Sequence, residues 1–133
     1  MKARHILFNT SWDEFDMGTC KFLVPFFNQY IEFLLFQDHQ PKPALTEKMI
    51  KAINDIMELD AKEQGLYFEV FGENPDVKVS EIHIDQEHDE LEGVYSEIIM
   101  SMPSGEYMSM IVKDGKIIYL DREGSYLESL KKS

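Results

Sequence analysis

Cysteine is almost absent from this 133-residue chain, in which Cys20 stands alone. An internal disulfide is therefore excluded, and a reducing cytoplasm is the compartment that we expect. Basic residues are also scarce, at 13 against 25 acidic ones, which gives a formal charge of −12. A charge of this sign repels phosphate backbones, so we expect no binding to nucleic acid.

Long apolar runs are missing as well. Near the N-terminus only residues 6–8 are consecutively apolar, which is shorter than the core of a signal peptide. No segment approaches the roughly 20 apolar residues that cross a bilayer. We therefore expect a cytoplasmic protein that makes no use of a membrane.

Motifs that hold nucleotides or activate nucleophiles are lacking too. The sequence contains neither GxGxxG nor GxxxxGK[ST], the glycine-rich patterns whose backbone amides bind phosphates. Its serine, histidine and aspartate residues show no recognisable catalytic arrangement. The sequence predicts no catalytic residue, no metal site and no cofactor, and it favours a protein without enzymatic activity.

The composition is that of one ordinary globular domain over residues 1–133. Hydrophobic residues make up 44% and charged residues 29% of the chain, as in typical compact proteins. A chain of this length buries about two-thirds of its unfolded surface, which is enough for one core without cross-links.

Alternating apolar residues predict strands in the first third of the chain. Residues 20–26 alternate at period two, and the largely apolar run at residues 30–36 follows. Because Pro25 has no backbone N–H, we expect the first of these strands to lie at a sheet edge or to be bulged there. A shorter strand is predicted at residues 6–8.

The clearest helix should begin after Thr46, following a loop over residues 38–43. The Thr46 hydroxyl is suited to cap the helix, and residues 49–57 carry apolar side chains at helical spacing. A second short helix is predicted within residues 61–71, although Gly65 weakens any continuous helix there.

The last third of the chain predicts further strands. After a turn over residues 72–76, alternation indicates strands around residues 82–84, 94–102 and 107–112, and a short amphipathic turn over residues 126–130.

Asp114 and Gly115 predict a type I′ hairpin, in which Val112 would face Ile117 and Met110 would face Tyr119. The order of strands, helices and further strands predicts an α+β fold. We expect a mostly antiparallel sheet of about six to seven strands, with one or two helices inserted after the first strands and packed on one face.

Acidity is concentrated in one segment, residues 55–92. It holds thirteen acidic and two basic side chains, so it carries −11 of the total −12. Such a localised field is suited to recognising a basic protein, although a solvated, solubilising face is an equally simple explanation. The residues predicted to contact a partner are Glu81, Asp85, Glu87, Asp89, Glu90, Glu92, Tyr67 and Phe68.

Two patterns resemble metal sites but have simpler explanations. Asp85, Glu87 and Asp89 alternate like calcium ligands, but Glu90 stands where such a loop requires glycine and Ser96 where it requires glutamate. A solvated connection between strands is favoured. Four methionines within residues 100–110 are suited to Cu(I), but are more simply core fillers.

The chain as a whole resembles small, acidic, uncharacterised bacterial proteins, some of which are regarded as immunity proteins of polymorphic toxins. The resemblance rests on Trp12, on residues 25–27, on the helix opening at residues 45–48 and on the strand at residues 81–84. It implies an α+β fold and a role in neutralising a basic toxin.

We therefore expect a non-enzymatic, protein-binding module that uses an acidic surface. The alternative is a small-molecule or metal-binding domain, or an enzyme, with its site between helix and sheet. A homo-oligomer formed through residues 30–36 is a third interpretation.

Overall fold

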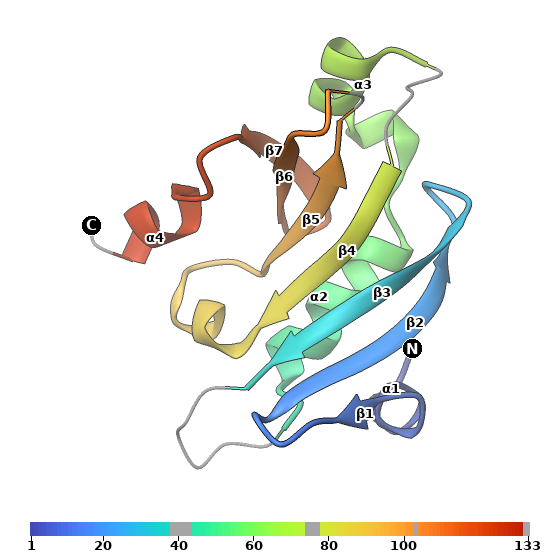
Figure 1. The fold of residues 1–133 in the computed structure, drawn as a ribbon, viewed down its shortest axis with the longest axis vertical. Helices are drawn as coiled ribbons and strands as arrows, with labels where there is room; N and C mark the ends of the chain where they lie inside the picture. Colours follow the sequence, from blue (N-terminus) through green and yellow to red (C-terminus); the bar gives the residue numbers. More distant parts are fainter. Residues whose placement is uncertain (38–43, 74–77, 103, 132–133) are drawn as a thin grey trace.

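The computed structural model describes residues 1–37, 44–73, 78–102 and 104–131. The loop predicted over residues 38–43 and most of the turn predicted over residues 72–76 lie outside these ranges. Within them, seven strands form one sheet, and their spatial order follows the chain from β1 to β7 (Figure 1). The structure confirms the predicted α+β fold.

Helices α2 and α3 separate a first group of strands, β1–β3, from a second group, β4–β7. The strands are β1 (Ser11–Trp12), β2 (Met17–Val24), β3 (Gln29–Phe36), β4 (Lys78–Asp85), β5 (Tyr95–Ser101), β6 (Tyr107–Lys113) and β7 (Lys116–Asp121). The α-helices are α1 (Ala3–Phe8), α2 (Glu47–Met57), α3 (Gly65–Phe71) and α4 (Tyr126–Lys131), and two 3₁₀ helices are η1 (Ala61–Glu63) and η2 (Gln86–Glu90).

All neighbouring strands are antiparallel except β3 and β4. This pair is parallel because α2 and α3 carry the chain from one end of the sheet back to the other, as a parallel connection requires. The pairing places Glu32 beside Glu81, and Leu34 beside His83.

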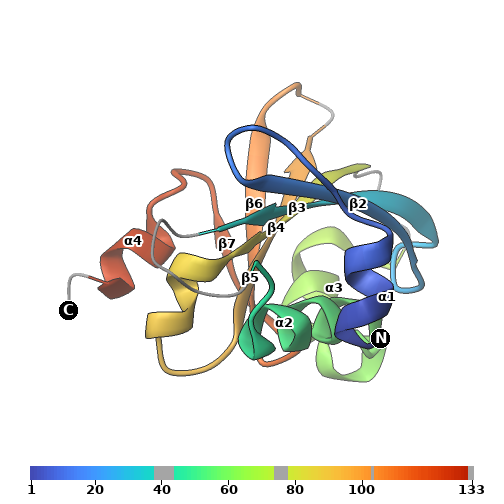
Figure 2. The same ribbon diagram turned by 90° about the horizontal axis from the view of Figure 1, so that it is seen from below.

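Helices α1, α2 and α3 lie on one face of the sheet, whereas α4 lies on the other (Figure 2). The main core is between the sheet and the first three helices. Its largest fully buried side chains are Ile6, Ile31, Phe33, Leu35, Met49, Ile53, Ile56, Ile82, Ile84, Ile98, Met100 and Met110. Met100 and Met110 are therefore core residues.

Helix α2 begins as predicted. The Thr46 hydroxyl accepts a hydrogen bond from the Met49 amide at 3.2 Å, which satisfies one of the free donors of the first turn. Glu47 follows in that turn, where the helix dipole favours an acid. The buried side of the helix then packs on β4 and β5.

Residues 61–71 are helical, as predicted, but Gln64 divides them. Its fully buried side-chain amide donates to the Gly115 carbonyl at 3.0 Å and accepts from the Ile117 amide at 2.8 Å. Gln64 thus pairs with the backbone at the start of β7, the last strand of the described sheet. Unpaired backbone on an edge strand invites association with other chains, and Gln64 shields part of it.

Helix α4 is anchored on the second face by the turn before it. The buried Asp121 carboxylate accepts hydrogen bonds from the amides of Glu123, Gly124 and Tyr126. The rings of Tyr119 and Tyr126 stack with their centroids 4.4 Å apart. A small second core forms there around Tyr95, Ile111 and Leu127.

Two predictions about the first strands are wrong. Residues 6–8 belong to α1, in which only Ile6 is buried, because a single inward side chain per turn suits a short helix. Pro25 follows the end of β2 and lies in the turn, so it removes no donor from the ladder. The strand β2 is not at the edge, because β1 pairs with it.

The β6–β7 hairpin confirms its predicted turn. Asp114 and Gly115 have φ values of 49° and 81°, the two positive values of a type I′ turn. Val112 faces Ile117 as predicted, but Met110 faces Leu120 and not Tyr119. A bulge at Ile118 adds one residue to β7 and shifts the pairing beyond it.

Candidate protein-binding surfaces

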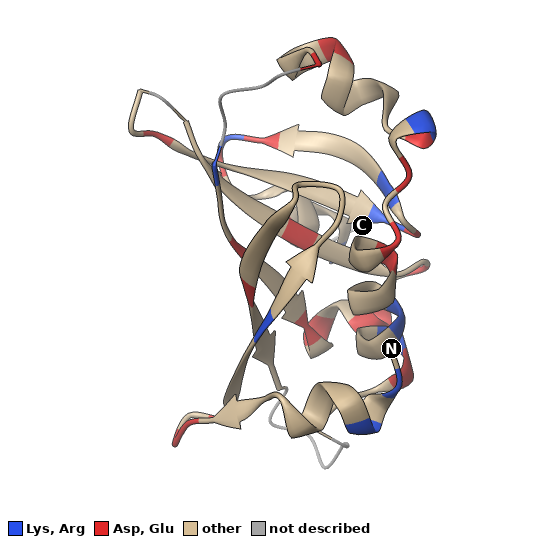
Figure 3. Ribbon diagram, turned by 90° about the vertical axis from the view of Figure 1, so that its right-hand side faces the viewer, with Lys and Arg blue, Asp and Glu red and all other residues tan. Residues whose placement is uncertain are grey.

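The predicted contact residues lie in three places. Glu81 is on β4, the acids of residues 85–92 form η2 and its flanks, and Tyr67 and Phe68 lie in α3. Acidic residues occur on helices, strands and loops alike (Figure 3). The described acids of residues 55–92 therefore lie on several separate elements, from α2 to η2, and do not form one patch.

Helix α3, which carries Tyr67 and Phe68, lies at the opposite end of the sheet from η2, the short helix that follows β4 (Figure 1). Tyr67 is only 4% exposed, and its ring lies 5.3 Å from that of Phe26 and 5.2 Å from that of Phe68. Burial raises the pKa of the Tyr67 hydroxyl. This aromatic group anchors α3 against the β2–β3 turn, which explains the aromatic pair after Pro25.

Residues 85–92, which we call the acidic arc, are held by the lysine of α2. The Lys48 ammonium donates hydrogen bonds to the carbonyl oxygens of Asp89, Leu91 and Gly93, at 3.0, 2.7 and 3.3 Å. Hydrogen bonds from a charged donor are roughly twice as strong as neutral ones. A segment rich in mutually repelling acids is thereby kept in one conformation.

Two acids of the arc, Asp85 and Asp89, are half-buried and serve the fold. The Thr46 hydroxyl donates to the Asp89 carboxylate at 2.7 Å, which ties the arc to the start of α2. The Asp85 carboxylate accepts from the Glu87 amide at 2.9 Å and caps η2. Burial raises the pKa of Asp85, although the Glu87 amide and His88 act in the opposite direction.

The other three acids of the arc, Glu87, Glu90 and Glu92, are exposed. Lys131 of α4 approaches Glu87 at 3.4 Å. Burial alone would lower the pKa of Lys131, but Glu128 and Glu87 raise it above its ordinary value. The outer side of the arc therefore presents glutamates with one partial counter-charge.

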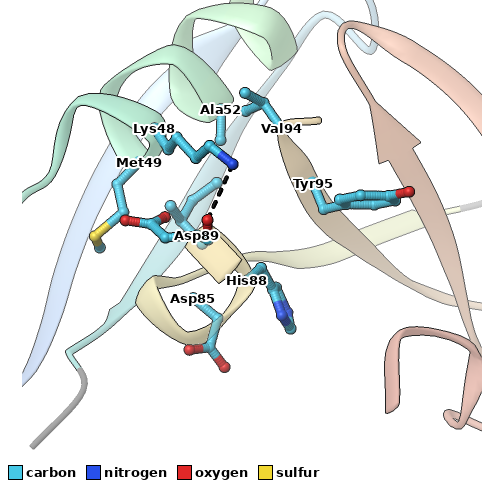
Figure 4. Close-up of a pocket in the computed structure, with 9 residues that line it drawn as sticks. Lys48, Met49, Ala52, Asp85, His88, Asp89, Val94 and Tyr95 are labelled. Atoms are coloured by element: carbon cyan, nitrogen blue, oxygen red, sulfur yellow. Dashed lines mark hydrogen bonds between the residues drawn. The ribbon is translucent and has the colours of Figure 1, made fainter. Parts of the chain in front are cut away.

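A small pocket lies between α2 and the arc, with Lys48, Asp85, His88 and Tyr95 in its wall (Figure 4). His88 is 6% exposed, and within the described ranges neither of its ring nitrogens has a hydrogen-bond partner. Its Nε2 lies 3.7 Å from a carboxylate oxygen of Glu97. The space holds roughly one water molecule, which such unpaired nitrogens attract.

Among the described residues, no three histidine, cysteine, aspartate or glutamate side chains converge as ligands for a metal ion. Asp85, Glu87 and Asp89, which alternate like calcium ligands in the sequence, have the separate roles described above.

A second surface, which we call the open face, includes part of residues 30–36, the run that the sequence offers as a homo-oligomer contact. It consists of the side chains of β2–β4 that point away from the main core, together with Glu97 and Ile99 of β5, and no described helix covers it over β2–β4 (Figure 1). Two of its apolar residues are well exposed on adjacent strands: Leu23 at 42% and Tyr30 at 70%.

Carboxylates lie among these apolar side chains. Glu32 and Glu81 are register partners on adjacent strands, and Lys21 is the partner of Glu32 on its other side. The Nε2 atom of His83 lies 3.5 Å from Glu81, and His83 is in turn the register partner of Glu97. The open face thus combines tyrosine and leucine with three glutamates.

One sequence signal indicated this face. The run at residues 30–36 is apolar at nearly every position, which requires cover on both sides or contact with a partner. The parallel pairing that brings Glu32 next to Glu81 left no signal, because it joins residues on either side of the helical crossover.

Comparisons of the chain with protein-family models, curated proteins and solved structures found no match. The resemblance to small acidic bacterial proteins therefore stays a prediction. Over the described residues, no helix has the length and apolar character needed to cross a membrane.

Proposed function

We propose that this protein is a non-enzymatic module that binds a basic protein, such as a toxin, through the acidic arc. The observation that supports this most is the clamp by Lys48, whose ammonium donates to the carbonyls of Asp89 and Leu91 in the arc and of Gly93 just after it. It fixes a glutamate-bearing segment before any partner arrives, which reduces the ordering cost of binding.

The exposed glutamates of the arc supply the attraction. Glu87, Glu90 and Glu92 lie within one short segment and repel one another, so cations from a partner relieve that repulsion. Complementary charge mainly accelerates capture, toward about 10⁸ M⁻¹s⁻¹ at low ionic strength. An immunity role would benefit from rapid capture.

Charge reversal on the arc tests this proposal. The variant carries Glu87→Lys, Glu90→Lys and Glu92→Lys and leaves Asp85 and Asp89 in place, because these two hold the fold. The probe is an octapeptide of alternating arginine and glycine, and its Kd is measured across a range of salt concentrations. We expect at least about tenfold weaker binding at low salt and a flatter salt dependence.

The matched control reverses three exposed acids of the helix layer, Glu58, Glu63 and Glu69, to lysine. It changes the net charge by the same amount. Equal losses of affinity in the two variants would show that the peptide responds to total charge, and the proposed arc site would then be wrong.

A further inference from the structure

The second face of the sheet is covered over only part of its width. Helix α4 buries Tyr95 to 8% and Ile111 to 0% exposure. On the same face, Leu23 of β2 and Tyr30 of β3 remain 42% and 70% exposed. One sheet face therefore has a closed half under α4 and an open half on β2–β5.

The open face has the composition of an interface. Tyrosine is enriched at binding surfaces because its ring gives large contact area while its hydroxyl remains compatible with water. Tyr30 and Leu23 are direct cross-strand partners, so they form one apolar ridge. Leu34, Phe36 and Ile99 add half-buried apolar surface beside it.

Its charges indicate the sign of the partner. The side chains of Glu81 and Glu97 are 36% and 23% exposed, so a cation beside them would interact through a less aqueous medium than at the arc. Glu32 and Glu81 are like charges directly opposite each other, an arrangement that destabilises a sheet by itself. Lys21 offsets only one side of this pair.

The same charges disfavour a second copy of this chain as the occupant. In a symmetric dimer through this face, each patch of Glu32, Glu81 and Glu97 would meet its own copy. Like charges brought together at an interface cost free energy. A partner with lysine or arginine between apolar residues meets both features of the face.

We propose that the open face binds a segment of another protein in which apolar residues alternate with lysine or arginine. The apolar side chains of the segment cover Leu23 and Tyr30, and its cations lie between Glu32, Glu81 and Glu97. This surface is separate from the outer side of the acidic arc, so the proposal holds whether or not the arc binds a partner.

The test uses an octapeptide of alternating leucine and lysine as the probe, with Kd measured by titration. The double variant Glu32→Gln, Glu81→Gln is expected to weaken binding at least about tenfold, because it removes both opposed carboxylates. The control Glu87→Gln, Glu90→Gln removes the same charge from the arc, and we expect less than about twofold loss. Equal losses in the two variants would overturn the proposal.

A second pair of variants tests the apolar contribution. Leu23→Ser is expected to weaken binding by about fivefold or more, because it removes apolar contact area. Val70→Ser, at a residue of α3 with similar exposure, should leave Kd unchanged. Unchanged binding by the Leu23 variant would refute the proposed contact.

Self-association is measured on the same proteins. A monomer at all concentrations tested is the expected result, because the like charges oppose a symmetric contact. Sedimentation that shows a dimer, lost in the Leu23→Ser variant but kept in Val70→Ser, would identify a second copy as the occupant and overturn the proposal. Circular dichroism confirms that each variant is folded.

Discussion

Strand β3 presents two different surfaces on its two sides. Ile31, Phe33 and Leu35 point to the helices and are at most 2% exposed. Tyr30 and Glu32 point the other way and are exposed. Because side chains alternate along a strand, one segment supplies both the centre of the core and the middle of the open face.

The contrast separates the face that stabilises the fold from the face that we propose for recognition. Helices α1, α2 and α3 bury one face of the sheet. The apolar side chains removed from water there are the main source of stability. The other face keeps large apolar and acidic side chains in contact with water, although α4 shows that a helix can cover that side. We propose that the part of this face not covered by α4 binds a partner.

The largest effect should come from the covered face. Phe33→Ala leaves a cavity beneath the helices and is expected to lower the free energy of unfolding by about 3–5 kcal/mol. Leu34→Ala, one residue along on the other face, should cost about 1 kcal/mol or less. Urea unfolding measures both, and equal costs would contradict the distinction between the faces.

The edge of the sheet should show a smaller effect. Gln64→Leu removes the amide that pairs with Gly115 and Ile117, and we expect a loss of about 1–3 kcal/mol in the free energy of unfolding. The neighbouring exposed residue gives the control, Glu63→Leu, which should change little. An unchanged free energy of unfolding in Gln64→Leu would show that the edge strand does not need this pairing.

Removing the Lys48 clamp on the acidic arc should lower the free energy of unfolding by less than the Gln64 substitution. Lys48→Met keeps the apolar stem and removes the ammonium, so we expect a loss of about 1–2 kcal/mol. Hydrogen exchange should become faster at the amides of residues 89–93 and stay unchanged in β3. Lys51→Met is the control, because the half-exposed Lys51 ammonium forms ion pairs with Asp55 and Asp114 rather than with the carbonyls of the arc. Unaltered exchange in the arc would contradict the clamp.

The smallest effect should be a change in the pH dependence of stability. Burial raises the folded-state pKa of Asp85 above its unfolded value, so the folded protein binds this proton more readily. Stability from this group is present below the unfolded pKa and is lost as pH rises through the folded pKa. Asp85→Asn cannot ionise, and its side-chain oxygen can still accept from the Glu87 amide.

Wild type and this variant should therefore be equally stable near about pH 3, with the variant relatively more stable by about pH 7. Urea unfolding at a series of pH values measures the difference. A variant that loses stability relative to wild type as pH rises would contradict burial as the dominant influence on Asp85.

Local chemistry determined which parts of the fold were predictable. The Thr46 cap, the Asp114–Gly115 turn and the alternation in β2 and β4 depend on neighbouring residues, and all three are confirmed. The helix at residues 3–8 was missed because three apolar residues fit a strand as well as a helix.

The proposed binding surfaces were harder to predict because they depend on pairing between distant segments. The sequence locates the acids of residues 85–92, but it gives no sign that Lys48 holds them or that Asp89 is engaged by Thr46. Tyrosine is a common anchor at interfaces, but Tyr67 lies in the core. Only the fold distinguishes an aromatic residue that packs inward from one that faces a partner.

The most direct test of the division between the two faces is a nuclear magnetic resonance titration of the whole chain with the leucine–lysine octapeptide. We expect backbone amide signals to shift along β2, β3 and β4 around Leu23, Tyr30 and Glu81, with α2 and α3 unaffected. Shifts confined to the helices, or no shifts at concentrations well above millimolar, would contradict the account.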